Sequence, residues 1–338
     1  ATMEPQNCTA DVRKDRCDVY IPTQGQTISH KVATKVSGLP PDKVHIHTTL
    51  LGCGLGRRPR PDQLIEAVIA SKETGKPVKV VYTREEDIQT DFFRSAMGHR
   101  IKGGLDDQNR LAAWDHKVSC SSLITHLGGK PKNGIDSYCL WGLWDKPESP
   151  NKANMTYKFP NFSVNLVLSD LPIPVAPFRS VQNAVNAFAT ESFMDEMAHL
   201  AGKDPFNFRL ESLTDDKRAG RVLESVVLNS NWGKPLPTGW GRGIAQHRSF
   251  GTTIAEVAEV SVDAKSGIIQ VHRVDVAVDC GPVVNPDPLE AQIQGAVALG
   301  VSTTLFEEVQ FADGGVASAN FDDYRILRMS ENPQVNVH

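Results

Sequence analysis

The sequence predicts an α+β fold in which helices pack on mixed β-sheets. Residues 44–83 combine two strand patterns with a helix between them, residues 183–230 carry a run of helix signals, and residues 254–279 have the pattern of a strand hairpin. Strands and helices that occur in blocks along one chain are typical of layered proteins, in which each block buries its apolar face against another layer.

The composition is that of an ordinary globular protein. The 338 residues are enough for two core-forming domains, and 40% of them are apolar and 22% charged. The formal net charge is -4, and no basic tract indicates nucleic acid or an anionic membrane surface. No apolar run approaches the length of a membrane span. The six cysteines form no C-x-x-C pair, which argues against a zinc or iron–sulfur site in the chain.

Both ends read as internal sequence. Residues 1–5 lack the basic and apolar regions of a secretory leader. Residues 332–338 resemble a strand that is interrupted. We therefore expect an internal piece of a longer polypeptide.

The N-terminal quarter predicts a strand, a short helix and then a βαβ unit. Residues 16–23 alternate like a strand, and residues 27–37 favour a short helix. The βαβ unit consists of a strand over 44–50, a helix over 62–74 and a strand over 78–83. Its default geometry is a right-handed parallel crossover.

The rest of the chain predicts further strands and helices around one irregular stretch. Residues 120–156, which include Trp141 and Trp144, either line a site, meet a partner or form a surface loop held down by the two tryptophans. A proline-containing linker at 235–239 divides the chain into predicted subdomains 1–238 and 239–338. The other predicted elements are a β-meander over 98–119, a strand over 163–170, helices over 183–200, 205–213 and 219–230, strands over 254–262 and 268–279, a helix over 288–304 and a hairpin at Asp313-Gly314.

A glycine loop, Gly52-Cys-Gly-Leu-Gly-Arg-Arg58, follows the strand over 44–50. Glycines at every second position let the backbone turn sharply and approach a ligand closely. The start of the next helix offers N–H groups to an anion, and Arg57 and Arg58 add bidentate donors for phosphate or carboxylate. The alternative is a tight glycine turn with two solvated arginines, and the loop alone does not decide between the two.

Common nucleotide-binding and catalytic motifs are absent from the sequence. A dinucleotide fingerprint requires glycine where this chain has Arg57, and no acidic residue closes the following strand. Neither the Gly-Lys-Ser/Thr of a P-loop nor a G-x-S-x-G elbow occurs. The ten histidines lack H-E-x-x-H or similar metal-binding spacing. A nicotinamide-dependent oxidoreductase is therefore the least favoured alternative.

Three polar glycine loops remain, at 52–58, 241–252 and 279–287. Together, their backbone N–H groups would wrap one large, phosphate-bearing ligand. Each loop taken alone fits a hairpin or a helix cap equally well. Side-chain amides would join the backbone groups, namely those of Gln24, Gln246, Gln292 and Gln294.

A series of motifs in fixed order runs along nearly the whole chain. They resemble the molybdopterin-binding large subunit of the xanthine dehydrogenase/aldehyde oxidase superfamily. Within it, they are most similar to the branch of isoquinoline 1-oxidoreductase beta subunits and bacterial membrane-associated aldehyde dehydrogenases. The motifs are Met3-Glu-Pro-Gln-Asn-Cys-Thr-Ala10, Pro22-Thr-Gln24, Leu51-Gly-Cys-Gly-Leu-Gly-Arg-Arg58, Pro77-Val-Lys-Val-Val-Tyr-Thr-Arg-Glu-Glu-Asp87, Arg179-Ser-Val181, Gly241-Arg-Gly-Ile-Ala-Gln-His-Arg-Ser-Phe-Gly251, Val278-Asp-Cys-Gly281, Val284-Asn-Pro-Asp287, Asn320-Phe-Asp-Asp-Tyr324 and Leu327-Arg-Met329.

The resemblance implies molybdopterin cytosine dinucleotide with molybdenum, in which the pterin dithiolene ligates the metal and no protein side chain does. It places the backbone of the glycine loop over the metal and Arg179 near the substrate pocket. The loops at 241–252 and 279–295 would hold the pterin, the pyrophosphate and the cytosine. The implied cofactor-binding residues are Gln24, Gly54, Leu55, Gly56, Arg57, Gln246, His247, Arg248, Ser249, Gly251, Thr252, Cys280, Gly281, Asn285, Gln292 and Gln294.

The resemblance also implies a reaction and partners. A glutamate base would help water-derived oxygen to attack an aldehyde or an electron-poor N-heteroaromatic carbon. Electrons would leave through [2Fe–2S] clusters on a small partner subunit, with haem c on a c-type cytochrome subunit as an optional further carrier. The expected location is the periplasm, and the cytoplasm is the alternative. The family's catalytic glutamate would follow His338, so no catalytic residue is assigned in this chain.

Departures from the family pattern keep a second class open, a non-catalytic scaffold paralogue of the same fold. The family's loop is usually Gly-Gly-Gly-Phe-Gly, whereas Cys53 and Leu55 stand at its second and fourth positions. Residues 181–186 lack the expected glycine and histidine, and no Gly-Glu motif occurs. Because these are pocket residues, the sequence leaves the choice between aldehydes and N-heterocycles open.

Overall fold

The computed structural model describes residues 1–143, 155–213 and 216–338, so Trp144 of the predicted irregular stretch lies outside the described residues. The chain forms two compact packing units. These units consist of segments that are discontinuous in the sequence, whereas the predicted subdomains divide the chain once, at residue 238; that boundary stays a prediction. The first unit comprises Ala1–Arg94, Pro172–Arg179 and Val309–Tyr324, and the second comprises Ser95–Leu171, Ser180–Glu308 and Arg325–His338.

The sheet of the first unit has the strand order β3-β2-β1-β4. β2 and β3 are parallel neighbours, whereas β1 is antiparallel to both β2 and β4. β3 and β4 therefore point the same way, as the predicted parallel crossover requires, but they lie at opposite edges of the sheet because β1 and β2 lie between them. The strands are β1 (Asn7–Val12), β2 (Cys17–Ile21), β3 (Val44–Thr48) and β4 (Val78–Val81).

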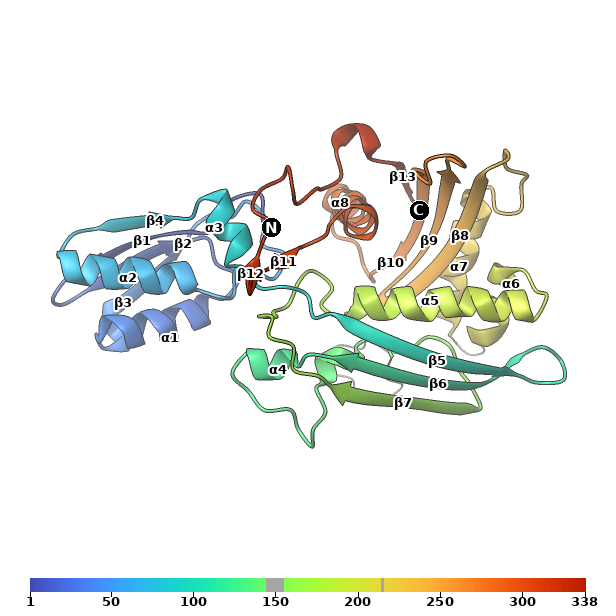
Figure 1. Cartoon of the computed structure of the whole chain (residues 1–338), viewed down its shortest axis with the longest axis horizontal. Coiled ribbons are helices and arrows are strands. Elements are labelled where there is room, and N and C mark those ends of the chain that lie inside the picture. The colour runs from blue at the N-terminus through green and yellow to red at the C-terminus, as the bar shows by residue number, and fades with distance from the viewer. Residues whose placement is uncertain (144–154, 214–215) are drawn as a thin grey trace. The chain divides into compact units, whose positions relative to one another are not determined.

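Two helices complete the core of the first unit (Figure 1). α1 (Gln26–Ser37) joins the parallel neighbours β2 and β3, and α2 (Asp62–Thr74) leads from the glycine loop towards β4. Ile21 of the sheet and Leu64 and Val68 of α2 belong to one buried apolar cluster. α2 ends at Gly75, whose φ of 64° is the left-handed conformation typical of a helix C-cap.

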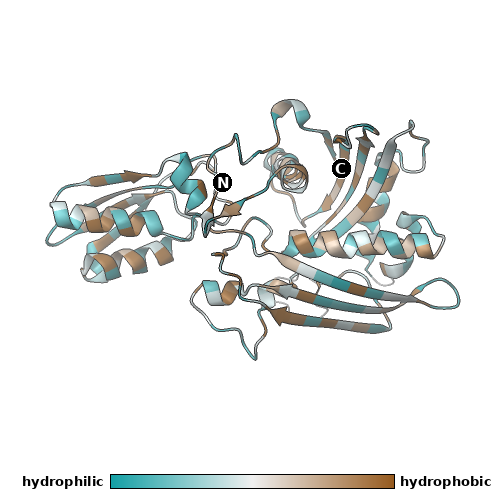
Figure 2. Ribbon diagram, viewed as in Figure 1, coloured by the Kyte–Doolittle hydropathy of each residue, from teal (hydrophilic) through white to brown (hydrophobic). Residues whose placement is uncertain are grey.

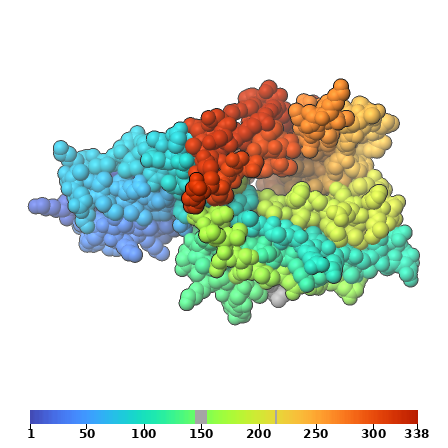
Figure 3. Space-filling model, in the orientation of Figure 1, coloured from blue at the N-terminus to red at the C-terminus, as the bar shows by residue number. Residues whose placement is uncertain are grey.

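Segments distant in sequence close the first unit around α3 (Arg84–Gln89). Phe93 forms a parallel bridge with Val175, and its ring contacts that of Phe311 with centroids 5.5 Å apart. The hairpin of β11 (Phe311–Ala312) and β12 (Gly315–Val316) follows the prediction and accepts a hydrogen bond from Gln89. Its red surface borders the light-blue surface around α3 (Figure 3).

The first sheet of the second unit has the order β5-β6-β7. β5 (Met97–Leu105) and β6 (Leu111–Cys120) form a single antiparallel pair within the predicted β-meander over 98–119, and β7 (Asn161–Leu168) is parallel to β6. Exposed and partly buried residues alternate along the whole of β7. This period of two shows that one face of the strand packs inward. Figure 2 shows the hydropathy of the residues along this sheet.

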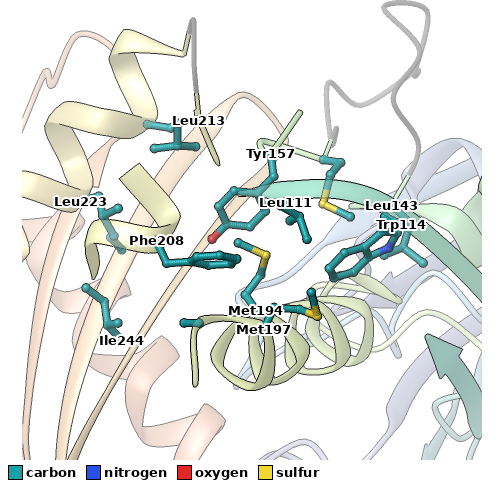
Figure 4. Close-up of a cluster of buried hydrophobic side chains, with 14 of the residues drawn as sticks. Leu111, Trp114, Leu143, Tyr157, Met194, Met197, Phe208, Leu213, Leu223 and Ile244 are labelled. Carbon is teal, nitrogen blue, oxygen red and sulfur yellow. The ribbon is translucent and has the colours of Figure 1, made fainter. Parts of the chain in front are cut away.

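Three helices pack between and beside the sheets of the second unit. α5 (Asn183–Leu200) and α6 (Pro205–Leu213) match their predicted bounds, and α7 (Lys217–Asn229) begins two residues early. Figure 1 shows α5 between β5–β7 and β8. Its methionines meet Trp114, Phe208 and Leu223 in the main apolar core (Figure 4).

The second sheet has the order β13-β10-β9-β8, with α7 on one face and α8 (Pro286–Leu305) on the other. The polar glycine stretch at 241–252 was expected to be a loop, and this is corrected. It forms β8 and the turn into β9, because every second residue from Ile244 onward can face the core. No helix in the described residues is both long and apolar enough to cross a membrane. The strands are β8 (Trp240–Ser249), β9 (Thr252–Val262), β10 (Ile269–Asp279) and β13 (Gln334–Val337).

Candidate cofactor-binding site

The glycine loop between β3 and α2 has an unusual backbone. Cys53, Leu55 and Gly56 have φ values of 81°, 51° and 92°. Glycine adopts such angles at little cost, whereas for other residues they cost about 1–3 kcal/mol and persist mainly at functional sites. Two residues with side chains held in this conformation make the loop the first candidate site.

Gln24 fastens this loop through its side-chain amide. The N–H of Gly56 donates to Oε1 of Gln24 at 3.1 Å. A Cβ at Gly54 would lie 2.5 Å from Cδ of Gln24, and a Cβ at Gly56 would lie 2.4 Å from the carbonyl oxygen of Pro177. Both positions therefore require glycine, and the structure brings the predicted residues Gln24, Gly54 and Gly56 together.

The loop also offers hydrogen-bond donors. In the described part of the chain, the N–H groups of Cys53, Gly54 and Leu55 have no protein acceptor. Gly54 is buried, and a buried N–H without a partner is costly. A ligand with acceptor atoms would satisfy these groups through the backbone alone.

The two arginines after the loop support it. Arg57 is 6% exposed and pairs with Asp62 at 2.5 Å and with Asp91 at 2.6 Å. Arg58 is fully buried and pairs with Glu4 at 2.9 Å. Burial raises the pKa of Asp91 to about 6, against the opposing charge of Arg57. These contacts rule out the alternative of two solvated arginines. The Arg57 guanidinium pairs with carboxylates, and its predicted role in cofactor binding stays a prediction.

Strand β8 distributes the next predicted residues over two faces, because side chains alternate along a strand. Gln246 and Arg248 lie on the face that meets the main core. His247 and Ser249 lie on the opposite face, and Thr252 of β9 pairs with Ser249 across the turn. The two pairs therefore have different environments.

The core-facing pair is tied into the interior. The N–H of Gln246 donates to Oε2 of Glu191 at 3.0 Å, and Glu191 pairs with Arg209 at 2.9 Å. Burial raises the pKa of Glu191. Arg248 pairs with Asp216 at 2.6 Å, so its guanidinium supports the fold, and its predicted role in cofactor binding likewise stays a prediction. In the described residues, the buried Oε1 of Gln246 has no partner, which leaves it available to a ligand.

On the opposite face, His247 is a hydrogen-bond acceptor. Its Nε2 lies 2.9 Å from Oδ1 of Asn183, and Nδ2 of Asn183 donates to the carbonyl of Ser180 at 3.1 Å. The second bond fixes the amide orientation, so Nε2 carries the proton and Nδ1 accepts. Burial lowers the pKa of His247 to about 4, and the ring is neutral at pH 7. A Cβ at Gly142 would lie 2.5 Å from Cε1 of this ring, so glycine makes room for it.

Arg218 brings two predicted loops together at one end of the second sheet. It donates to the carbonyl of Gly251 at 2.9 Å and pairs with Asp279 at 2.7 Å. The N–H of Gly281 donates to the same carboxylate at 3.0 Å. Asn285 then caps α8 by accepting a backbone N–H at 3.2 Å. Residues 249–252, 279–281 and the start of α8 thus form one group within the second unit.

Three other predicted residues are exposed, Cys280, Gln292 and Gln294. Nε2 of Gln294 donates to Glu290 on the same helix at 3.0 Å. Gln292 and Gln294 are two positions apart in α8 and therefore point in different directions. The structure does not bring these two amides together.

Comparison with known proteins shows to which family the chain belongs. Two family models, each described as a molybdopterin cofactor-binding domain, match residues 1–129 and 224–333. The chain belongs to the molybdopterin cofactor-binding family. This confirms the family recognised from the sequence motifs.

Relatives from bacteria extend over the whole chain. The beta subunit of isoquinoline 1-oxidoreductase from Brevundimonas diminuta is 31% identical over 100% of this chain and 43% of its own length. A membrane-bound aldehyde dehydrogenase (pyrroloquinoline-quinone) of Gluconacetobacter polyoxogenes is 30% identical over 99% of this chain and 46% of its own length. The chain therefore spans less than half the length of these relatives.

Solved structures confirm the α+β fold of the family. Quinoline 2-oxidoreductase from Pseudomonas putida 86 superposes with a TM-score of 0.82 at 12% identity, covering 100% of this chain and 67% of that chain. The aldehyde oxidoreductase from Desulfovibrio gigas superposes with a TM-score of 0.79 at 13% identity, covering 100% of this chain and 54% of that chain.

The glycine loop fits a molybdopterin group. A Cβ at Gly54 would fill the space next to Gln24, and unpaired N–H groups await acceptors beside it. Residues 1–143, 155–213 and 216–338 contain no group of three or more His, Cys, Asp or Glu side chains that could hold a metal ion by themselves. A group that brings its own metal ligands and is held by backbone N–H donors suits such a loop.

Arg179, the predicted pocket residue, lies in the first unit next to the segment that contacts Gly56. Its carbonyl accepts a hydrogen bond from Arg94 at 2.9 Å. Ser180 and Val181 follow with φ values of 76° and 53°, and a β-branched residue in this conformation is a rare outlier. The role of Arg179 in a substrate pocket stays a prediction.

Sequence reasoning missed the buried polar network behind β8. Glu191 is 6% exposed in α5, and Arg209 of α6 is fully buried. The helical spacing carried a signal, because Glu191 precedes the buried Met194 and Ala198 by three and seven positions. That spacing places all three on one helix face.

Proposed function

We propose that this chain supplies the molybdopterin-binding part of a molybdenum hydroxylase large subunit. Such an oxidoreductase oxidises an aldehyde or hydroxylates an N-heteroaromatic ring with oxygen derived from water. The observation that carries the proposal is the glycine loop, in which Gln24 holds a backbone with three unpaired N–H groups. Relatives named as an aldehyde dehydrogenase and an isoquinoline oxidoreductase support both substrate classes.

The chain's residues bind and orient the cofactor in this proposal. The N–H groups of Cys53, Gly54 and Leu55 donate to the part of the group around the metal. In the second unit, the turn at Gly281 and the start of α8 offer backbone donors and a positive helix end to phosphate. When bound, the cofactor supplies the two-electron redox chemistry that no side chain here provides.

We further infer the finer identity of the cofactor and partners from the motifs. The cofactor is molybdopterin cytosine dinucleotide, and the primary partner is a small [2Fe–2S] subunit. A c-type cytochrome with haem c is the further candidate partner, and the periplasm is the proposed location, with the cytoplasm as the alternative. Support comes from the relatives named as parts of multi-subunit oxidoreductases, one of them a nicotinate dehydrogenase from Pseudomonas putida.

One observation favours the second candidate, a non-catalytic scaffold. Cys53 and Leu55 carry side chains at positive φ in the very loop that would meet the metal. A backbone optimised for cofactor binding would be cheaper with glycine there. The scaffold hypothesis therefore predicts a folded chain that purifies without cofactor.

Metal and nucleotide analysis of the native complex separates the two hypotheses. The complex should be purified through a tag on this chain, and its molybdenum measured by inductively coupled plasma mass spectrometry. Acid hydrolysis should release cytidine monophosphate. About one molybdenum and one nucleotide per chain support the enzyme, whereas a folded complex lacking both excludes it in favour of the scaffold.

Partner and substrate follow from the same preparation. Iron, acid-labile sulfide and haem should be quantified in the subunits that copurify with the chain. Reduction of the iron–sulfur spectrum by an aldehyde but not by quinoline, or the reverse, assigns the substrate class. A complex without any redox centre contradicts the proposed electron transfer.

A further inference from the structure

In the part of the chain that the structure describes, one carboxyl group on the second sheet has no hydrogen-bond or ion-pair partner. It belongs to Glu256 in the middle of β9, and burial raises its pKa. The other acidic groups at the centre of β9 and β10 are paired: Glu259 with Arg242 at 2.8 Å, and Asp275 with Arg273 at 2.7 Å. A desolvated carboxyl without a partner costs stability, and it persists where it meets a ligand.

Strand register places Glu256 on the same face as His247 and Ser249. Glu256 pairs with Ala245 of β8, His247 pairs with Ile254, and Ser249 pairs with Thr252. Because side chains alternate along a strand, residues 245, 247 and 249 all lie on one face of β8. Their cross-strand partners in β9 lie on the same face of the sheet. Glu256 and His247 are thus diagonal neighbours, with Cα atoms roughly 7–8 Å apart.

This face is only partly covered by α8. Ile293 and Val297 of the helix pack on Val274 and Val276 of β10. Ile254 and Ala258, which flank Glu256 on the same face of β9, belong to that apolar cluster, whereas no residue of β8 does. His247 and Glu256 are neither fully exposed nor fully buried. We call the positions of Glu256, His247 and Ser249 the polar shelf.

The polar shelf offers hydrogen-bonding groups that the chain itself leaves unused. Nδ1 of His247 is an acceptor, because Nε2 carries the proton and donates a hydrogen bond to Oδ1 of Asn183. The buried Oγ of Ser249 has no partner in the described residues. Glu256, which is only partly buried, makes no hydrogen bond or ion pair there through its carboxyl group. Two acceptors and a hydroxyl at this spacing match a flat ring that carries several N–H groups.

We propose that Glu256, together with His247 and Ser249, binds the amino edge of an aminopyrimidine ring. A carboxylate accepts from the exocyclic amine and from the adjacent ring N–H of a pterin. A protonated carboxyl group accepts from the exocyclic amine of cytosine and donates to its adjacent ring nitrogen, which carries no hydrogen. The inference rests on the proposed function, because the proposed cofactor contains two such rings, the pterin and the cytosine. Glu256 would then be a specificity-determining residue that the sequence motifs do not include.

Direct binding measurements test this without the loaded enzyme. Free pterin and cytidine monophosphate are titrated separately into the purified full chain and followed by calorimetry. Glu256→Gln and Glu256→Ala should weaken the binding of one ring at least about tenfold. Weakening for pterin only assigns the shelf to the pterin, and weakening for the nucleotide only assigns it to the cytosine.

A matched control separates the shelf from general damage. Glu259→Gln removes a carboxylate from the same strand on the opposite face, and it should leave both affinities within about twofold. Thermal unfolding of each variant verifies that it folds. If Glu256→Gln binds both rings as wild type does, or if wild type binds neither, the inference is overturned. Molybdenum and nucleotide in the native complex would still uphold the proposed function in that case.

Discussion

The glycine loop and the β8 region prepare a binding surface in opposite ways. In the loop, the side chains of Arg57, Arg58 and Gln24 bind other groups of the protein. The backbone N–H groups of residues 53–55 have no acceptor in the described residues. In β8, the backbone pairs with β9 on one side and, at Gln246, donates to Glu191, and side-chain atoms of Gln246 and Ser249 have no partner in the described residues. If each region binds a ligand as proposed, the glycine loop would recognise it through backbone groups and β8 would recognise it through side chains.

The difference predicts different sensitivity to mutation. A backbone site depends on φ angles and on the absence of Cβ atoms, so conservative side-chain changes matter little. A side-chain site depends on the hydrogen bonds and ion pairs that hold each side chain in place. Loss of a partner in that network therefore weakens the site even when the partner does not contact the ligand. The first region should be intolerant at glycines, and the second should be intolerant at buried ion pairs.

The largest effect is expected in the network behind β8. Arg209→Leu leaves the carboxylate of Glu191 buried without its cation, and Glu191 holds the N–H of Gln246. We expect a loss of about 3–5 kcal/mol in the free energy of unfolding, measured by urea denaturation at pH 7. Arg110→Leu, which removes an exposed pair with Asp106, should change stability little. Equal stability of both variants would refute the role of the network.

The two regions should also respond oppositely to pH. Burial lowers the pKa of His247 to about 4, so the unfolded chain binds its proton first and stability falls as the pH drops from about 6.5 to 4. Burial raises the pKa of Asp91 to about 6, so the folded chain holds that proton and stability falls as the pH rises from about 4 to 6.

Difference curves isolate these contributions. The stability of wild type minus that of His247→Gln should rise with pH across 4–6.5 by up to about 3 kcal/mol. The corresponding difference for Asp91→Asn should fall with pH across 4–6. Guanidinium denaturation at half-unit pH steps gives both difference curves. If the two curves run parallel, burial does not shift the pKa values of His247 and Asp91 in opposite directions.

An intermediate effect is expected at the loop. Gly56→Ala places a Cβ 2.4 Å from the Pro177 carbonyl at a φ of 92°. We expect about 2 kcal/mol of destabilisation and loss of molybdenum from the native complex. Gly98→Ala is the control, because a Cβ there meets no atom within 4 Å. A Gly56→Ala complex with full molybdenum content would contradict backbone recognition by this loop.

Local patterns predicted some elements well. The helices at 183–200 and 205–213 follow from apolar spacing and from the Asp204-Pro205 start, and both are confirmed at their bounds. The glycine loop could be recognised because its spacing is itself local. Gln24, which contacts this loop, was among the cofactor-binding residues that the family resemblance implies, but the contact itself was not predicted.

Tertiary pairing explains what the sequence did not predict. Nothing local shows that Arg57 meets Asp91, thirty-four positions later, instead of a phosphate. β8 contains glycines at 241 and 243, which weaken a strand signal, and only its pairing with β9 makes it a strand. The order β3-β2-β1-β4 likewise depends on β1 inserting between strands that are neighbours in the βαβ pattern.

The smallest expected effect distinguishes backbone strain from side-chain function at the loop. Cys53 has a φ of 81°, and its side chain lacks a hydrogen bond in the described residues. Cys53→Gly relieves about 1–2 kcal/mol of strain but adds about 0.5–1 kcal/mol of unfolded-state entropy, so a net gain of about 0.5–1 kcal/mol is expected. Cys53→Ala keeps the strain and should match wild type in thermal denaturation. If glycine stabilises the chain and the complex keeps its molybdenum, the loop acts through its backbone alone; if either cysteine variant loses molybdenum while remaining folded, the thiol takes part in binding and the comparison of the two regions must be redrawn.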